Sequence, residues 1–141
     1  MKVRNATAKD VRHILKLVST AKEVEAYEGN KPSENFIRSH LYNPHNVMLV
    51  CEEKGKIIGS LTAEMWKDKK YAFISTIVVH KETRGMGVGT MLYNSFEKSC
   101  KKNHIKAINF LVLSTNKKMQ NWSEKKGFRK GHLMYFYEKG I

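Results

Sequence analysis

The sequence has few cysteines, prolines and acidic residues, and the shortage of cysteine excludes a class of proteins. Its 141 residues include two cysteines, Cys51 and Cys100, and two prolines. Two cysteines are too few for the disulfide framework of a small secreted protein, and no Cys-x-x-Cys pattern or His/Cys cluster suggests a metal site. We therefore expect reduced thiols, no bound metal and a cytoplasmic location.

Long apolar runs are also missing. No run approaches the roughly 20 residues that a membrane-spanning helix needs, and Met1–Asn5 lacks the apolar core of a signal peptide. Hydrophobic residues make up 41% of the chain and charged residues 28%, which is typical of a globular protein. We expect no membrane contact and a single domain over residues 1–141. The composition does not separate a monomer from a homodimer.

Acidic residues are half as numerous as basic ones, 13 against 26, so the formal net charge is +13. Residues 1–70 carry 13 basic and 9 acidic residues, or +4, whereas residues 71–141 carry 13 and 4, or +9. A basic chain can bind nucleic acid. Here, however, the charge is mostly Lys spread along the chain, and Arg is the better bidentate reader of phosphate. Nucleic acid is therefore an alternative partner that is not favoured, and an anionic cofactor would explain part of the excess.

The pattern of apolar and turn residues predicts an α/β (α+β) protein. The predicted strands cover 2–6, 46–53, 57–66, 73–79, 107–113, 128–130 and 133–137. The predicted helices cover 8–20, 32–42, 88–102 and 117–126. No linker, repeat or low-complexity segment divides the chain.

The most informative stretch runs from the strand at 73–79 into the following helix. A turn after the strand leads into the glycine-rich loop Arg84–Thr90. Such a loop at a helix start is a common anion site, because backbone N–H groups and the helix dipole converge there. No Lys precedes Thr90, so this is not a Walker A loop, and Thr90 stands where a dinucleotide fingerprint has its third Gly. The alternative is a tight glycine turn that holds no ligand.

Arg84 to Gly89 read Arg-x-x-Gly-x-Gly, and Arg84 lies five residues after Val79. This loop resembles the pyrophosphate-binding loop of the GNAT N-acetyltransferase superfamily. Residues 116–128 resemble that family's Asn-x-x-Ala-x-x-Phe/Leu-Tyr-Glu-Lys-x-Gly-Phe motif, with Met119 in place of Ala and Ser123 in place of Tyr. The resemblance implies a mixed, mostly antiparallel central sheet of six to seven strands, flanked by about four helices and splayed at the central strand.

The resemblance also implies transfer of an acetyl group from acetyl-CoA, the cosubstrate, to a primary amine on a small molecule or a peptide. The implied acetyl-CoA contacts are the end of the central strand, the glycine loop and the Asn of the second motif: Ile77, Val78, Val79, Arg84, Gly85, Met86, Gly87, Val88, Gly89, Thr90 and Asn116. The Val79 backbone N–H would be the oxyanion donor. Two alternatives stay open: a GNAT fold that binds acyl-CoA with little or no catalysis, and a basic nucleic-acid-binding module.

The motifs leave the proton donor and acceptor open. An ammonium must lose a proton before it attacks, and Glu64, His80 and the glutamates of 23–28 are the candidate bases. In the family, the Tyr at the position of Ser123 often protonates the departing thiolate. Here Ser123, Tyr135 or Tyr137 would take that role, or the thiolate would leave unaided.

Glu23, Glu25 and Glu28 form the densest acidic cluster of this basic chain. By the resemblance, their segment lies beside the acceptor entrance, so we expect it to attract a cationic amine. The alternative is a solvated helix end that takes no part in binding.

Overall fold

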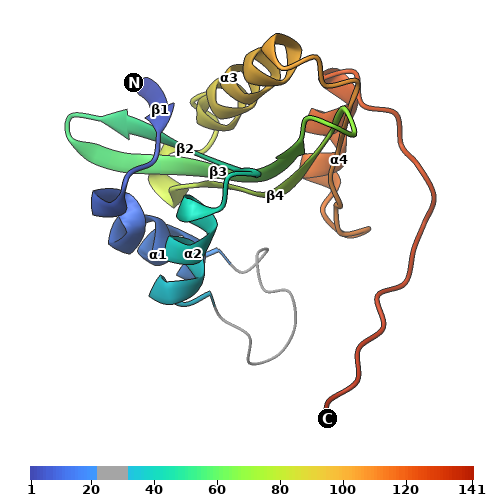
Figure 1. The fold of residues 1–141 in the computed structure, drawn as a ribbon, viewed down its shortest axis with the longest axis horizontal. Helices are drawn as coiled ribbons and strands as arrows, with labels where there is room; N and C mark the ends of the chain where they lie inside the picture. The colour runs from blue at the N-terminus through green and yellow to red at the C-terminus, as the bar shows by residue number, and fades with distance from the viewer. Residues whose placement is uncertain (22–31) are drawn as a thin grey trace. The chain divides into compact units, whose positions relative to one another are not determined.

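The computed structural model describes residues 1–21 and 32–141. These residues form two compact units, Met1–Phe110 and Leu111–Ile141. The first unit holds a five-stranded sheet with helices on both faces, and the second holds one helix (Figure 1). The single domain expected over residues 1–141 stays a prediction.

The sheet of the first unit has the strand order β1-β2-β3-β4-β5. The strands are β1 (Lys2–Asn5), β2 (Asn46–Glu53), β3 (Lys56–Trp66), β4 (Tyr71–Val79) and β5 (Ala107–Asn109). The first three pairings are antiparallel and the β4–β5 pairing is parallel. The predicted fold class, a mixed and mostly antiparallel sheet, is confirmed.

Two helices cover one face of this sheet. Helix α1 (Val11–Ser19) follows a 3-10 turn at Ala8–Asp10, and α2 (Glu34–Tyr42) follows Ser33, whose hydroxyl accepts a hydrogen bond from the Phe36 N–H at 3.1 Å. Such a cap satisfies a backbone donor that the helix itself leaves unpaired. Apolar side chains at helical spacing pack on the sheet in one buried cluster that comprises Val11, Ile14, Ile37, Met48 and Val50.

Helix α3 (Val88–Lys102) covers the opposite face (Figure 1). Val88, Leu92 and Phe96 recur every four residues and are buried, so they form the stripe that a helix turns toward a core. Val88 and Leu92 approach the backbone of β3 at Gly59. The contact places the first turn of α3 directly against the sheet.

The second unit contains α4 (Lys117–Lys125). The side-chain oxygen of Asn116 accepts a hydrogen bond from the Met119 N–H at 3.1 Å and caps the start of the helix. Gly127 follows the end of the helix at φ 87°, the left-handed conformation that glycine adopts most readily after a helix.

Five strands are present in the described residues, against six to seven predicted. The strand predicted at 107–113 ends at Asn109, and residues 128–141 form no strand. The apolar side chains of Leu133–Tyr137 are exposed. Their β propensity misled the prediction, because such residues form a strand only where a neighbouring backbone pairs with them. No helix among the described residues is long and apolar enough to cross a membrane.

Candidate functional site

The parallel strand β5 covers one edge of β4 only in part. It pairs with Tyr71–Phe73, and no strand among the described residues of the first unit pairs with this edge from Ile74 to Val79. Just after β4, the His80 N–H donates to the Ile58 carbonyl of β3 at 2.8 Å. Because backbone groups alternate in direction along a strand, the N–H and C=O of Val79 point away from β3, toward the uncovered edge.

Ser75 is an extra residue in β4. Thr62 of β3 pairs with Thr76, and the next residue, Ala63, pairs with Ile74, so Ser75 has no partner in the β3 register. A bulge bends a strand and increases its twist. It occurs two residues beyond the last pairing with β5, in the part of β4 that β5 does not cover.

The turn after β4 returns Arg84 to the end of the strand. A 3-10 turn at Lys81–Thr83 is closed by a hydrogen bond from the Thr83 N–H to the His80 carbonyl at 2.9 Å. The Arg84 Nε–H then donates to the Val79 carbonyl at 3.2 Å. The guanidinium therefore lies next to the backbone end of β4 and directly before the glycine loop.

Gly85 and Gly87 explain the conformation of the loop. Their φ angles are 83° and 81°, in the left-handed region where a residue with a Cβ atom is strained. No heavy atom lies within 4 Å of a Cβ built on either residue, apart from its chain neighbours. The loop therefore exposes a stretch of backbone with open space in front of it.

Helix α3 begins immediately after this loop, with Gly87 as its N-cap. The first N–H groups of an α-helix have no acceptor within the helix, so those of Val88 and Gly89 face the loop. The first turn contains no acidic residue, and the positive end of the helix dipole is not neutralised there. Loop and helix start together are suited to hold a phosphate-like anion.

The second unit carries four of the predicted site residues, Asn116, Ser123, Tyr135 and Tyr137, and Tyr135 is exposed. The side chain of Asn116 is occupied as the cap of α4. Ser123 is buried, and its hydroxyl donates to the Met119 carbonyl at 2.6 Å. Tyr137 lies in the irregular segment after α4 and is 88% exposed.

Glu64 is not brought next to Val79. It pairs with Phe73, whereas Val79 pairs with Gly59, five positions away along β3. At about 3.3 Å per residue this separates the two sites by roughly 17 Å. A general base must lie within hydrogen-bond reach of its proton, or one water away. Glu64 therefore does not reach a reaction centred on the Val79 N–H.

The predicted acidic cluster lies outside the part of the chain that the structure describes. Glu23, Glu25 and Glu28 fall in residues 22–31, outside the described residues. No group of three His, Cys, Asp or Glu side chains in the described part of the chain is placed to hold a metal. Sequence reasoning missed Gly59, although a glycine inside a strand is a signal of close backbone approach.

Comparison with known proteins identifies relatives of this chain. The sequence model described as the acetyltransferase (GNAT) family matches residues 12–128. The chain is 31% identical over 112 residues to N-alpha-acetyltransferase 60 from Xenopus tropicalis. That match covers 72% of this chain and 46% of the frog protein, so the chain spans about half the length of this relative.

Solved structures show the same fold at low sequence identity. An aminoglycoside antibiotic 6'-N-acetyltransferase from Acinetobacter haemolyticus superposes with a TM-score of 0.79 at 18% identity, covering 100% of this chain and 99% of the other. The ribosomal-protein-S18-alanine N-acetyltransferase from Escherichia coli superposes with a TM-score of 0.79 at 14% identity, covering 93% and 79%. At these identities the likeness concerns the fold alone.

Proposed function

Because the chain belongs to the acetyltransferase (GNAT) family, we propose that it transfers an acetyl group from acetyl-CoA to a primary amine. Its similarity to an N-alpha-acetyltransferase supports an amine acceptor. The acceptor in this proposal is a small amine or the amine of a peptide, and it carries net positive charge.

The observation that carries the proposal is the loop between β4 and α3. Gly85 and Gly87 turn the backbone at positive φ and leave open space in front of it. The N–H groups of the α3 start and the charge of Arg84 suit the pyrophosphate of acetyl-CoA. The uncovered edge of β4 begins one short turn away, and its backbone groups suit the amides of the pantetheine arm.

When bound, acetyl-CoA supplies a thioester whose C–S bond breaks as the bond from the amine nitrogen to the acetyl carbon forms. The Val79 N–H, which points away from β3, would donate to the oxygen that becomes negative. The backbone of Ile77 would hold the reactant along the edge. The ammonium form of the acceptor loses one proton before attack and a second as the amide forms, both to water or to a base other than Glu64, which lies too far from this point. The sulfur departs as the thiolate of CoA.

One observation favours a second candidate, a GNAT fold that binds acyl-CoA without catalysis. The Ser123 hydroxyl proton is used in a hydrogen bond to the Met119 carbonyl, so Ser123 is a poor proton donor for a departing thiolate. Catalysis does not need that donor, however, because a thiolate is a stable leaving group near neutral pH. We therefore keep transfer as the proposed function.

Two measurements test the proposal in sequence. A thermal-shift titration with acetyl-CoA should raise the melting temperature, and at a hundred times its Kd the ligand should add about 2.7 kcal/mol of stability. Thiol release is then followed with a panel of primary amines. No rise in melting temperature would refute the cofactor assignment. A rise without thiol release from any amine would support the second candidate.

A further inference from the structure

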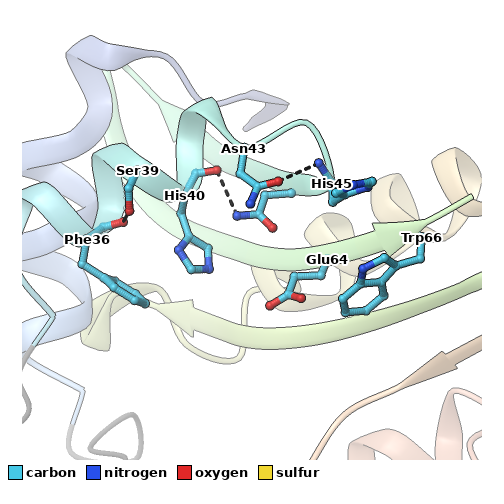
Figure 2. A pocket seen from close by; sticks show the side chains of 8 residues that line it. Phe36, Ser39, His40, Asn43, His45, Glu64 and Trp66 are labelled. Atoms are coloured by element: carbon cyan, nitrogen blue, oxygen red, sulfur yellow. Dashed lines mark hydrogen bonds between the residues drawn. The ribbon is translucent and has the colours of Figure 1, made fainter.

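A cavity of about 360 Å³ lies between the end of α2, the start of β2 and the end of β3 (Figure 2). The described residues that line it all belong to the first unit. Among the described residues, its wall combines one carboxylate, Glu64, with the rings of Phe36, His40 and Trp66, and none of these lining residues is Lys or Arg. In a chain of net charge +13, this is a local site with an acidic and aromatic wall.

Glu64 reaches this cavity because of its place in the sheet. It lies between Asn46 on β2 and Phe73 on β4. Trp66, two residues further along β3, projects from the same face of the sheet, and Figure 2 shows both side chains on the side of α2. Glu64 is half-buried, and among the described residues its carboxylate takes part in no side-chain hydrogen bond or ion pair.

The side-chain amides of the wall already have partners. The Asn46 side-chain amide donates to the His40 carbonyl at 3.1 Å, and the Asn43 side-chain oxygen accepts from the His45 N–H at 2.9 Å. These bonds join the end of α2 to the start of β2 (Figure 2). The wall is thereby held in shape, and the Glu64 carboxylate is left to bind a ligand.

Aromatic contacts also hold the rings in place. The rings of Trp66 and Tyr71 stack, with centroids 5.7 Å apart and planes at 20°. The rings of Phe36 and His40 lie 4.6 Å apart. A carboxylate beside fixed aromatic rings favours an organic cation, because the ring faces attract positive charge and the carboxylate pairs with it.

We propose that this cavity binds an ammonium group of the acceptor, distinct from the amine that is acetylated. The inference rests on the proposed function for its biological meaning. The separation along β3 makes Glu64 a specificity-determining residue and not a base. It anchors one positive charge of the acceptor while another amine reacts at the uncovered edge of β4.

The register gives the length of such an acceptor. Glu64 lies three positions along β3 from the partner of Ile77 and five from the partner of Val79, or about 10 to 17 Å at the rise of a strand. Thr62 and Thr76, directly opposite each other and half-buried, form a polar strip on the same face of the sheet. A linear polyamine spans this distance. So does a peptide whose basic side chain follows its N-terminal amine by about three to five residues.

Calorimetric titration without acetyl-CoA tests the ammonium site directly. The probe is 1,8-diaminooctane and its uncharged control is 1,8-octanediol. We expect the diamine alone to bind, with affinity that falls as salt is added. Glu64→Gln should weaken diamine binding about fivefold, and Trp66→Leu about threefold. Asp68→Asn removes a carboxylate from the exposed turn beyond β3, outside the cavity, and should leave the affinity unchanged.

Equal diamine affinity in Glu64→Gln and the parent would overturn the proposal. An equal loss of diamine affinity in Asp68→Asn would also overturn it, because the loss would then come from the change in net charge and not from the cavity. Acetyl-CoA thermal shifts of Glu64→Gln report whether the fold and the cofactor site are intact. If Glu64-dependent binding is found but no amine is acetylated, the ammonium site stands and the proposed function fails.

Turnover assays with spermine and with a pentapeptide that carries a Lys at its fourth position distinguish the two sources of the ammonium group. A KM raised about fivefold by Glu64→Gln, with kcat unchanged, is expected for the true acceptor class. A fall in kcat at unchanged KM for both acceptors would contradict the anchoring role and would return Glu64 to the candidate bases.

Discussion

A Cβ atom on Gly59 would lie 2.7 Å from Cγ1 of Val88, closer than real Cβ atoms approach a neighbour. Gly59 pairs with Val79 at the end of β4, and Val88 is the first residue of α3. This close contact therefore joins β3, the strand that pairs with the end of β4, to the first turn of α3, which follows the glycine loop. The absence of a side chain at Gly59 sets how near α3 lies to the sheet.

Gly59→Ala should disturb both the fold and the cofactor site. Val88 must move to admit the methyl group, so we expect a loss of about 1–3 kcal/mol in the free energy of unfolding and weaker acetyl-CoA binding. Urea unfolding and thermal-shift titration measure the two effects. Gly131→Ala, where no atom lies within 4 Å of the added Cβ, is the control and should match the parent. Unchanged acetyl-CoA affinity in Gly59→Ala would show that this contact does not position α3.

Gly87→Ala should reduce acetyl-CoA binding, and Gly87→Glu should remove it. Gly87→Ala strains the left-handed backbone by about 1–2 kcal/mol, and Gly87→Glu adds a negative charge in front of the pyrophosphate. Gly127→Ala is a matched control, because Gly127 also has positive φ and open space but follows α4. We expect similar losses of stability in the two alanine variants and reduced acetyl-CoA binding only at Gly87. Equal affinity in both would count against the loop as the cofactor site.

Ser123→Ala should reduce turnover less than tenfold. The Ser123 hydroxyl donates to the Met119 carbonyl and is not available to protonate a thiolate. Steady-state rates of thiol release at saturating acetyl-CoA measure the effect. A thousandfold fall in kcat, about 4 kcal/mol, would identify Ser123 as the acid after all.

Asp10 should make the stability of the fold depend on pH. Arg4 Nη1 and Nη2 lie 2.8 and 3.0 Å from its two carboxylate oxygens. Chiefly because of these hydrogen bonds, the pKa of Asp10 falls from 3.8 to about 2. The folded state holds the proton less tightly than the unfolded state. The pair therefore contributes its full stability above about pH 5 and loses it as the pH falls toward 2.

The size of this effect is about 2 kcal/mol. Urea unfolding of the parent at pH 6, 4 and 3 should show the loss. Asp10→Asn should be less stable at pH 6 and should change less over the same interval. The same fall with pH in the variant as in the parent would mean that other carboxylates carry the pH dependence.

The two thiols should be unreactive in the folded protein. Cys51 and Cys100 are buried, and burial raises the pKa of Cys51 and raises that of Cys100 to about 11. An aromatic disulfide reagent at pH 8 should therefore label neither residue until urea is added, when both should react. Fast labelling without urea would reveal opening of the core around α3 or β2. Low labelling would also keep the background of the thiol-release assay small.

The glycine loop and its neighbouring elements could be predicted from the sequence, because the forces that form them are local. Positive φ at Gly85 and Gly87 and the apolar spacing of α3 act over a few residues. The strand at 73–79 was predicted almost to its observed ends, because β-branched residues fill it. The position of Arg84 directly before the loop also follows from the local sequence. Its hydrogen bond to the Val79 carbonyl could not be predicted in this way.

Only the tertiary structure decided the features that require contacts between residues far apart in the sequence. The strands predicted at 128–130 and 133–137 do not form, because β propensity makes a strand only where the tertiary structure supplies a ladder of neighbouring backbone. The bulge at Ser75 and the contact at Gly59 arise from register and packing between elements. Glu64 was a candidate base by its residue type. The sheet register places it roughly 17 Å along β3 from the partner of Val79, and α2 brings the rings of Phe36 and His40 to the same cavity, because strand pairing and packing, not sequence order, set which side chains meet.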